Sequence, residues 1–104
     1  MLNNIYLVGR LVSDPELKET ENNKKVSKIT LAVPRSYKNE DGIYETDFIP
    51  ARLFNGIATQ TLEYCKKGDL IGIKGRLQMS DTLEVIAEKV TFLSTNKDLI
   101  NRED

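Results

Sequence analysis

Two segments in the first half of the chain alternate between apolar and polar residues, which predicts β-strands over residues 26–37 and 43–54. Residues 39–42 have turn chemistry and favour a hairpin between them. The residues that share the inner face are Ile29, Leu31 and Val33 on the first segment and Ile49, Ala51 and Leu53 on the second. Pro34 and Pro50 predict interruptions of regular pairing, because proline donates no ladder hydrogen bond.

Three further apolar segments predict strands, and one segment predicts a helix. The strands span residues 4–12, with a bend or bulge at Gly9, and residues 69–79 and 82–93. Residues 16–25 are polar and predict a loop. From Asn55 to Cys65, apolar side chains recur every four residues, which is typical of an amphipathic helix with Asn55 as its N-cap.

The order of these elements favours one small architecture. It is strand, strand, strand, helix, strand, strand, with short strands punctuated by glycine. We therefore predict an all-β fold, a five-stranded OB-fold Greek-key barrel with one α-helix between strands 3 and 4. An SH3-like barrel usually lacks that helix, and a ferredoxin-like fold needs two. We expect residues 1–94 to form the domain and residues 95–104 a short polar C-terminal tail.

Composition argues against most enzymes. The 104 residues contain no His and one Cys, so Ser-His and Cys-His catalytic pairs, the usual zinc sites and internal disulfides are excluded. We expect no catalytic residues, no metal and no cofactor. Apolar runs are too short for a membrane helix, and a lone thiol without an export signal predicts a cytoplasmic protein with no membrane partner.

The net charge of −1 hides a local pattern. Residues 24–38 carry five cations and no acid, residues 66–78 carry four cations against Asp69 alone, and residues 39–47 carry four acids. Local fields rather than the summed charge attract phosphates, so the two basic segments are candidates for nucleic-acid binding. An ordinary mixed surface is the alternative.

Aromatic residues interrupt the outer face that should be polar. Phe48 and Phe54 lie on the outer face of the strand over residues 43–54, with Arg52 between them, and Tyr37 ends the neighbouring strand. Exposed rings bordered by cations can stack on unpaired bases. The cations that interleave with these rings are Arg35, Lys38, Arg52, Lys67, Lys74 and Arg76. The alternative is that the rings pack under a loop or in a subunit interface.

Over about residues 1–93, the sequence resembles the bacterial single-stranded DNA-binding protein family. The segments that carry the resemblance include MLNN at 1–4, LVGRL at 7–11, DPEL at 14–17, ITLAV at 29–33, YCKKGD at 64–69 and GRLQ at 75–78. The resemblance implies binding of single-stranded DNA in replication, repair or recombination, usually as a homotetramer. It further implies that Tyr37, Phe48 and Phe54 occupy base-stacking positions, and that Lys18 and Lys67 lie near the DNA path.

Two departures from the family qualify these expectations. The loop between the last two strands is cut to residues 79–82, so we expect a smaller DNA site and weaker wrapping. The family's long linker and acidic tip have no counterpart after residue 94, so partners that dock on that tip are not predicted. Residues 5–8 are apolar on both faces, which favours a homo-oligomer, a tetramer or else a dimer. A protein-interaction module with weak DNA binding is the alternative function.

Overall fold

Every apolar segment predicted to be a strand forms one in the computed structural model, which describes residues 1–94. The elements are β1 (Ile5–Leu11), β2 (Lys18–Glu19), β3 (Lys25–Lys38), β4 (Tyr44–Phe54), α1 (Asn55–Tyr64), β5 (Leu70–Met79) and β6 (Leu83–Ser94). The two-residue β2 pairs with the start of β3, inside the segment that was predicted to be a loop. The predicted tail over residues 95–104 lies outside the described residues.

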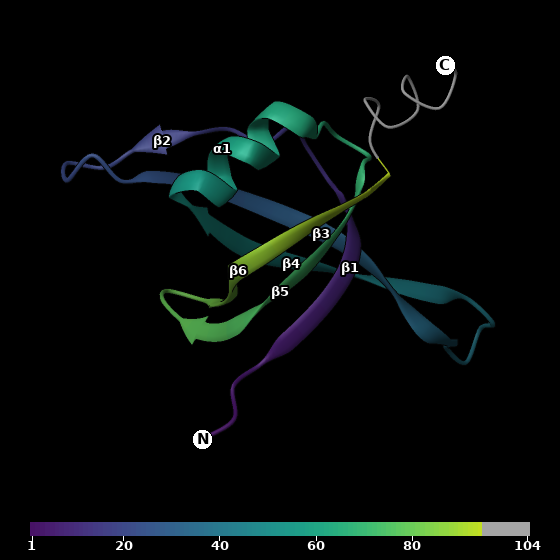
Figure 1. Cartoon of the computed structure of the whole chain (residues 1–104). Helices are drawn as coiled ribbons and strands as arrows, with labels where there is room; N and C mark the ends of the chain where they lie inside the picture. Colours follow the sequence, from purple (N-terminus) through teal and green to yellow (C-terminus); the bar gives the residue numbers. More distant parts are fainter. Residues whose placement is uncertain (95–104) are drawn as a thin grey trace, which may run out of the picture.

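The sheet closes on itself into a barrel. Its strand order is β1-β5-β6-β4-β3-β2, and β1 also pairs with β3 through Arg10–Ala32 and Leu11–Leu31. Helix α1 separates β4 and β5, which are the third and fourth of the five predicted strands (Figure 1). The predicted OB-fold is therefore confirmed.

The barrel interior holds one apolar core, and α1 covers one end of it (Figure 1). The buried core residues are Leu11, Ile29, Leu31, Ala51, Leu53, Ala58, Cys65, Ile71, Ile73, Val85 and Ala87. The predicted cap of α1 is wrong. Phe54 occupies the N-cap position without a side-chain bond, while Asn55 takes a left-handed φ of 53° and its Oδ1 accepts a hydrogen bond from the Lys25 N–H at 3.4 Å.

The predicted strand irregularities are partly right. Pairing of β3 with β4 shifts register after Pro34, as expected, but it runs unbroken through Pro50, so the interruption predicted there is wrong. Pairing of β1 with β5 is regular through Gly9, so no bulge occurs there. Glycine is needed because β1 passes close to β3, where a Cβ on Gly9 would lie 2.8 Å from the Ala32 carbonyl oxygen.

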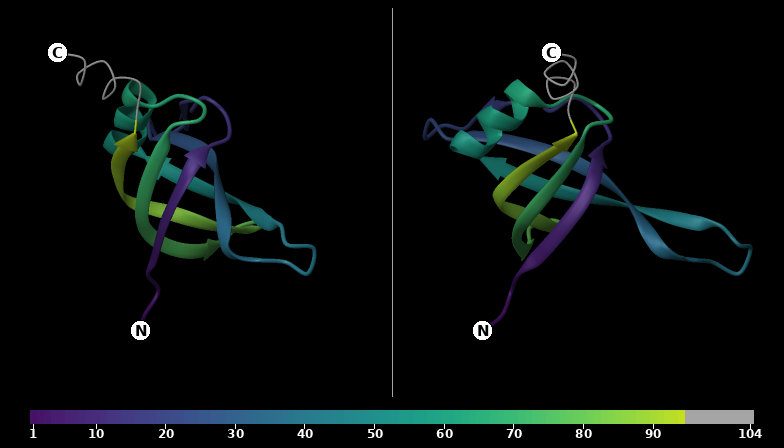
Figure 2. Two further views of the ribbon diagram at one scale, coloured as in Figure 1. Left: turned by 90° about the vertical axis from the view of Figure 1, so that its right-hand side faces the viewer. Right: turned by 45° about the vertical axis from the view of Figure 1, so that its right-hand side comes forward.

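Beyond Pro34, β3 and β4 leave the barrel and continue as a two-stranded projection, which we call the arm (residues 35–47) (Figure 2). Its tip is ordered by Asn39, whose Oδ1 accepts hydrogen bonds from the backbone N–H groups of Asp41 and Ile43 at 2.9 and 3.0 Å. The arm carries Tyr37 away from the barrel wall that holds Phe48 and Phe54.

Candidate nucleic-acid interface

The outer face of β3 and β4 forms a continuous row of cross-strand pairs, because alternation turns every second side chain of both strands outward. From the helix end toward the arm, these pairs are Phe54–Val26, Arg52–Lys28, Pro50–Thr30, Phe48–Ala32 and Thr46–Pro34. Arg52 and its partner Lys28 thus lie between the two aromatic rings along one wall of the barrel, and the position of Arg52 is as the sequence predicts.

The three candidate aromatics differ in exposure. Phe48 is 64% exposed and Tyr37 is 62% exposed, whereas Phe54 is half-buried. Six residues of extended strand separate Phe48 from Phe54, a span of about 20 Å. The rings therefore cannot contact the same base, and together they suit an extended ligand that crosses from the barrel onto the arm.

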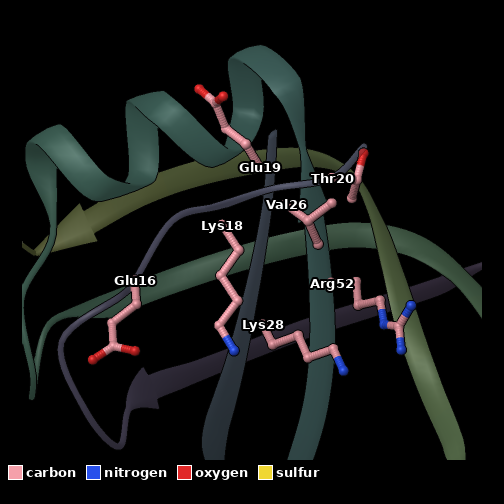
Figure 3. Close-up of a pocket in the computed structure, with 7 residues that line it drawn as sticks. All are labelled: Glu16, Lys18, Glu19, Thr20, Val26, Lys28 and Arg52. Carbon is pink, nitrogen blue, oxygen red and sulfur yellow. The ribbon is translucent and has the colours of Figure 1, made fainter. Parts of the chain in front are cut away.

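Three basic side chains converge beside Phe54. Lys18 from β2, Lys28 from β3 and Arg52 from β4 line a pocket of about 360 Å³ together with Glu16, Glu19, Thr20 and Val26. Figure 3 shows the two ammonium groups and the guanidinium directed to the same side of this pocket. Lys28 and Arg52 come together because they are paired across β3 and β4, and the β2 hairpin brings in Lys18. We call this pocket the basic pocket.

A second hollow adjoins the basic pocket and brings in Lys67. It has a volume of about 440 Å³ and is lined by Ser13, Asp14, Glu16, Lys28 and Lys67. The Lys67 backbone N–H donates a hydrogen bond to the Asp14 Oδ1 at 2.7 Å, which fixes the turn after α1 against the loop after β1. Lys28 and Glu16 line both hollows, so the surface from Arg52 to Lys67 is continuous.

Arg35, a predicted cation of the interface, is held by two acids of the arm. Its Nε and Nη2 donate to the Asp47 carboxylate at 3.1 and 3.0 Å, and its Nη1 lies 2.6 Å from Glu45 Oε2. The hydrogen bond and the charge of Asp47 raise the pKa of the Arg35 guanidinium. The hydrogen bond from Arg35 in turn lowers the pKa of the Asp47 carboxyl. The pairing neutralises Arg35 and ties β3 to β4 in the arm.

Arg52 is also ion-paired, with a carboxylate beneath it. Its Nε lies 2.9 Å from Glu84 Oε1, although the alignment falls short of a hydrogen bond. The Glu84 side chain is only 8% exposed. A buried carboxylate needs a cation, and Arg52 supplies it.

The remaining predicted cations are dispersed. Lys38 lies 5.6 Å from the centre of the Tyr44 ring on the arm, a cation–π contact. Arg76 and Arg52 both face Ile86, from the two strands that flank β6. Lys74 lies on another wall of the barrel, opposite Tyr6 of β1, and its Nζ is 4.0 Å from Glu88 Oε1. The structure therefore groups Lys18, Arg52 and Lys67, and separates Lys74 from them.

The candidate residues predicted from the sequence omitted Lys28, which lines both hollows. The signal was present in the strand alternation, which places Lys28 on the outer face of β3. Counting outward from the turn at residues 39–42 does not give its partner, because the register shift after Pro34 changes the count. The contact between Lys28 and Arg52 was therefore not deducible from the hairpin alone.

Within residues 1–94 the structure contains neither a cluster of metal ligands nor a membrane-spanning helix. In this range no three or more His, Cys, Asp and Glu side chains come together as metal ligands. The helix found there is too short and too polar to traverse a bilayer.

Comparisons with known proteins agree with the resemblance. The sequence profile of the Single-strand binding protein family matches residues 2–93. Single-stranded DNA-binding protein B of Bacillus subtilis (strain 168) is 39% identical over 103 residues, covering 89% of this chain and 91% of that protein. Single-stranded DNA-binding protein 1 of Lactococcus lactis subsp. lactis (strain IL1403) is 40% identical, with 93% of this chain and 71% of that protein covered. Single-stranded DNA-binding protein 1 of Staphylococcus aureus (strain MSSA476) is 38% identical, with 100% and 73% covered.

Proposed function

Because the chain belongs to the single-strand binding protein family, we propose that it binds single-stranded DNA without catalysing a reaction on it. The binding is largely independent of sequence and serves DNA replication, repair or recombination in the cytoplasm. The observation that carries the proposal is the exposed Phe48 ring on the same barrel wall as the basic pocket. Residues 1–94 form the DNA-binding domain, and residues 95–104 are a short polar tail.

Base stacking supplies the part of the binding that tolerates any sequence. Every base has a flat π-face, and each stacked base contributes about 1–3 kcal/mol. Phe48 and Tyr37 present exposed rings, and Phe54 contributes the accessible part of its half-buried ring. The spacing of these rings along β4 and the arm supports a strand of several nucleotides lying across them.

Basic side chains supply the affinity that depends on salt. Basic side chains that bind the phosphates displace the counterions condensed on DNA, so binding weakens as salt concentration rises. The cations assigned to this role are Lys18, Arg35, Lys38, Arg52, Lys67, Lys74 and Arg76. Three of them, Arg35, Arg52 and Lys74, are already paired with carboxylates, so each offers less charge to DNA than its sequence position suggests.

We also propose a homo-oligomer, a tetramer or else a dimer, that forms through β1. The edge of β1 that meets β3 is paired only at Arg10 and Leu11, which leaves most of that edge without a strand within the described residues. Tyr6 and Val8 on the same strand are 72% and 53% exposed. An open strand edge beside exposed apolar residues favours pairing with a second copy. Light scattering should give a mass above 11.8 kDa, whereas a monomer at micromolar concentration would contradict the proposal.

Titration of fluorescein-labelled oligo-dT, followed by anisotropy at several NaCl concentrations, tests the proposed function. We expect micromolar or tighter affinity at low salt, and a logarithm of the binding constant that falls linearly with the logarithm of salt concentration. Oligo-dT and a mixed sequence should bind within a few-fold of each other. A folded oligomer that binds neither oligonucleotide would instead select the protein-interaction module, which the three ion-paired cations favour.

A further inference from the structure

We infer that the basic pocket is a phosphate subsite, in which Lys18, Lys28 and Arg52 hold one backbone phosphodiester of the bound strand. The inference rests on the proposed function and assigns one point of contact within it. It adds Lys28 to the interface and gives Arg52 a specific ligand. The subsite fixes where the DNA backbone passes relative to the stacking rings.

The placement of the three cations suits a single anion. They come from three neighbouring strands, and adjacent strands lie about 4.8 Å apart, so three charged groups can surround one phosphate. Figure 3 shows them directed into the same space, with the Glu19 carboxylate pointing away and Glu16 at the end of the pocket opposite Arg52. Val26 and the stems of the lysines form apolar walls that reduce competition from water.

Glu84 prepares Arg52 for this role. The carboxylate comes closest to the guanidinium at Nε, and within residues 1–94 neither Nη1 nor Nη2 makes a hydrogen bond. A guanidinium held at Nε keeps its two terminal nitrogens free for the oxygens of a phosphate, the geometry in which arginine binds anions best. The ion pair neutralises part of the Arg52 charge, and Glu16 and Glu19 also line the pocket, so Lys18 and Lys28 carry the positive charge that a phosphate would meet.

The subsite also lies between the two aromatic rings of β4, along the proposed path of the DNA. Phe54 follows Arg52 by two residues on the same outer face of β4, and Phe48 precedes it by four. A backbone anchored between two rings places one base toward each side. The pocket thus connects Phe48 and Phe54, so that both rings contact the same DNA strand rather than bind bases independently.

Lys28 is the best residue for a test. Replacing Arg52 would leave the buried Glu84 carboxylate without its cation and would destabilise the fold, whereas Lys28 is exposed and has no bonded partner within residues 1–94. Lys28→Gln removes the charge and keeps most of the stem, and Lys28→Arg restores a cation. Lys89→Gln is the matched control, because Lys89 is an exposed lysine of β6 that lines no part of the pocket and belongs to neither basic segment.

The experiment measures anisotropy of labelled oligo-dT with these variants over a range of NaCl concentrations, with thermal unfolding as a check on folding. Lys28→Gln should weaken binding about threefold to tenfold at low salt, as expected for one charge-assisted contact. It should also reduce the salt-dependence slope by about 0.7, which corresponds to one phosphate of a single strand. Lys28→Arg should restore the slope, and Lys89→Gln should leave it at the wild-type value.

The possible results separate the subsite from the function. Wild-type protein that binds oligo-dT while Lys28→Gln and Lys89→Gln change the slope equally would overturn the subsite and leave the proposed function standing. A wild-type protein that does not bind oligo-dT would overturn both. A salt-dependence slope that is reduced in Lys28→Gln alone, with the unfolding temperature unchanged, supports both the subsite and the proposed function.

Discussion

Phe48→Ala should lower the affinity for oligo-dT about 5- to 150-fold, because the variant loses one stacked base worth about 1–3 kcal/mol. The ring is 64% exposed and lies opposite Ala32, so its removal takes little from the core. We expect the free energy of unfolding to change by less than about 1 kcal/mol. Titration by anisotropy and denaturation of the same sample measure both quantities.

Two further variants separate stacking from the loss of exposed apolar surface. Phe48→Trp keeps a larger flat ring and should bind at least as tightly as wild type. Ile43→Ala removes an aliphatic side chain that is 58% exposed on the arm, and should bind like wild type. The salt slope should stay constant in all three proteins, because none loses a cation. If Phe48→Ala instead halves the mass of the oligomer, the ring lies between subunits and the stacking mechanism fails.

The sequence sufficed for the barrel and for the direction of its side chains. Alternation in a strand has a period of two, so once one residue such as Leu31 is placed in the core, every second neighbour is placed as well. This is why the exposure of Phe48 and the outward position of Arg52 could be predicted. The helix followed from its four-residue spacing, and Pro34 correctly marked the change of register.

Long-range pairing could not be predicted in the same way. Glu84 contacts Arg52 because β6 lies parallel to β4, and no local pattern indicates which strands become neighbours in a closed barrel. Asp47 is paired with Val33, and it meets Arg35 diagonally across β3 and β4 beside the register shift between Pro34 and Lys38. In both cases the charge of a predicted DNA contact depends on an acid that is distant in the sequence.

Glycine positions show the same limit. Gly9 was predicted to mark a bend or bulge, but the structure gives it, and Gly75 as well, a steric reason that depends on another strand. Asn55 reads as a helix cap, but a left-handed φ makes it the corner between β4 and α1 instead. The local sequence identifies positions with an unusual backbone requirement. Whether that requirement is a close strand contact or a left-handed φ depends on how the surrounding structure packs.

Gly75→Ala should destabilise the fold by about 3 kcal/mol or more, enough to remove much of the stability of a domain of this size. Gly75 lies at the register shift of β5, directly against the backbone of β6. An added Cβ would overlap the Ile86 carbonyl oxygen and lie 3.2 Å from the Ala87 Cα. These are backbone atoms of a paired strand, so relief requires β5 and β6 to separate where the barrel core is built.

Gly72→Ala on the same strand provides the matched control. Its Cβ would meet Leu93 Cδ1 at 3.6 Å and nothing nearer, which is ordinary van der Waals contact. We expect its free energy of unfolding to lie within about 1 kcal/mol of the wild-type value. Denaturant unfolding followed by circular dichroism compares the two variants. Equal denaturation midpoints would contradict the prediction, because they would show that the β6 backbone shifts at Ile86 to make room for the added methyl group. Because both substitutions add the same methyl group to the same strand, a difference between them isolates the close approach of β5 to β6 that curves this wall of the barrel.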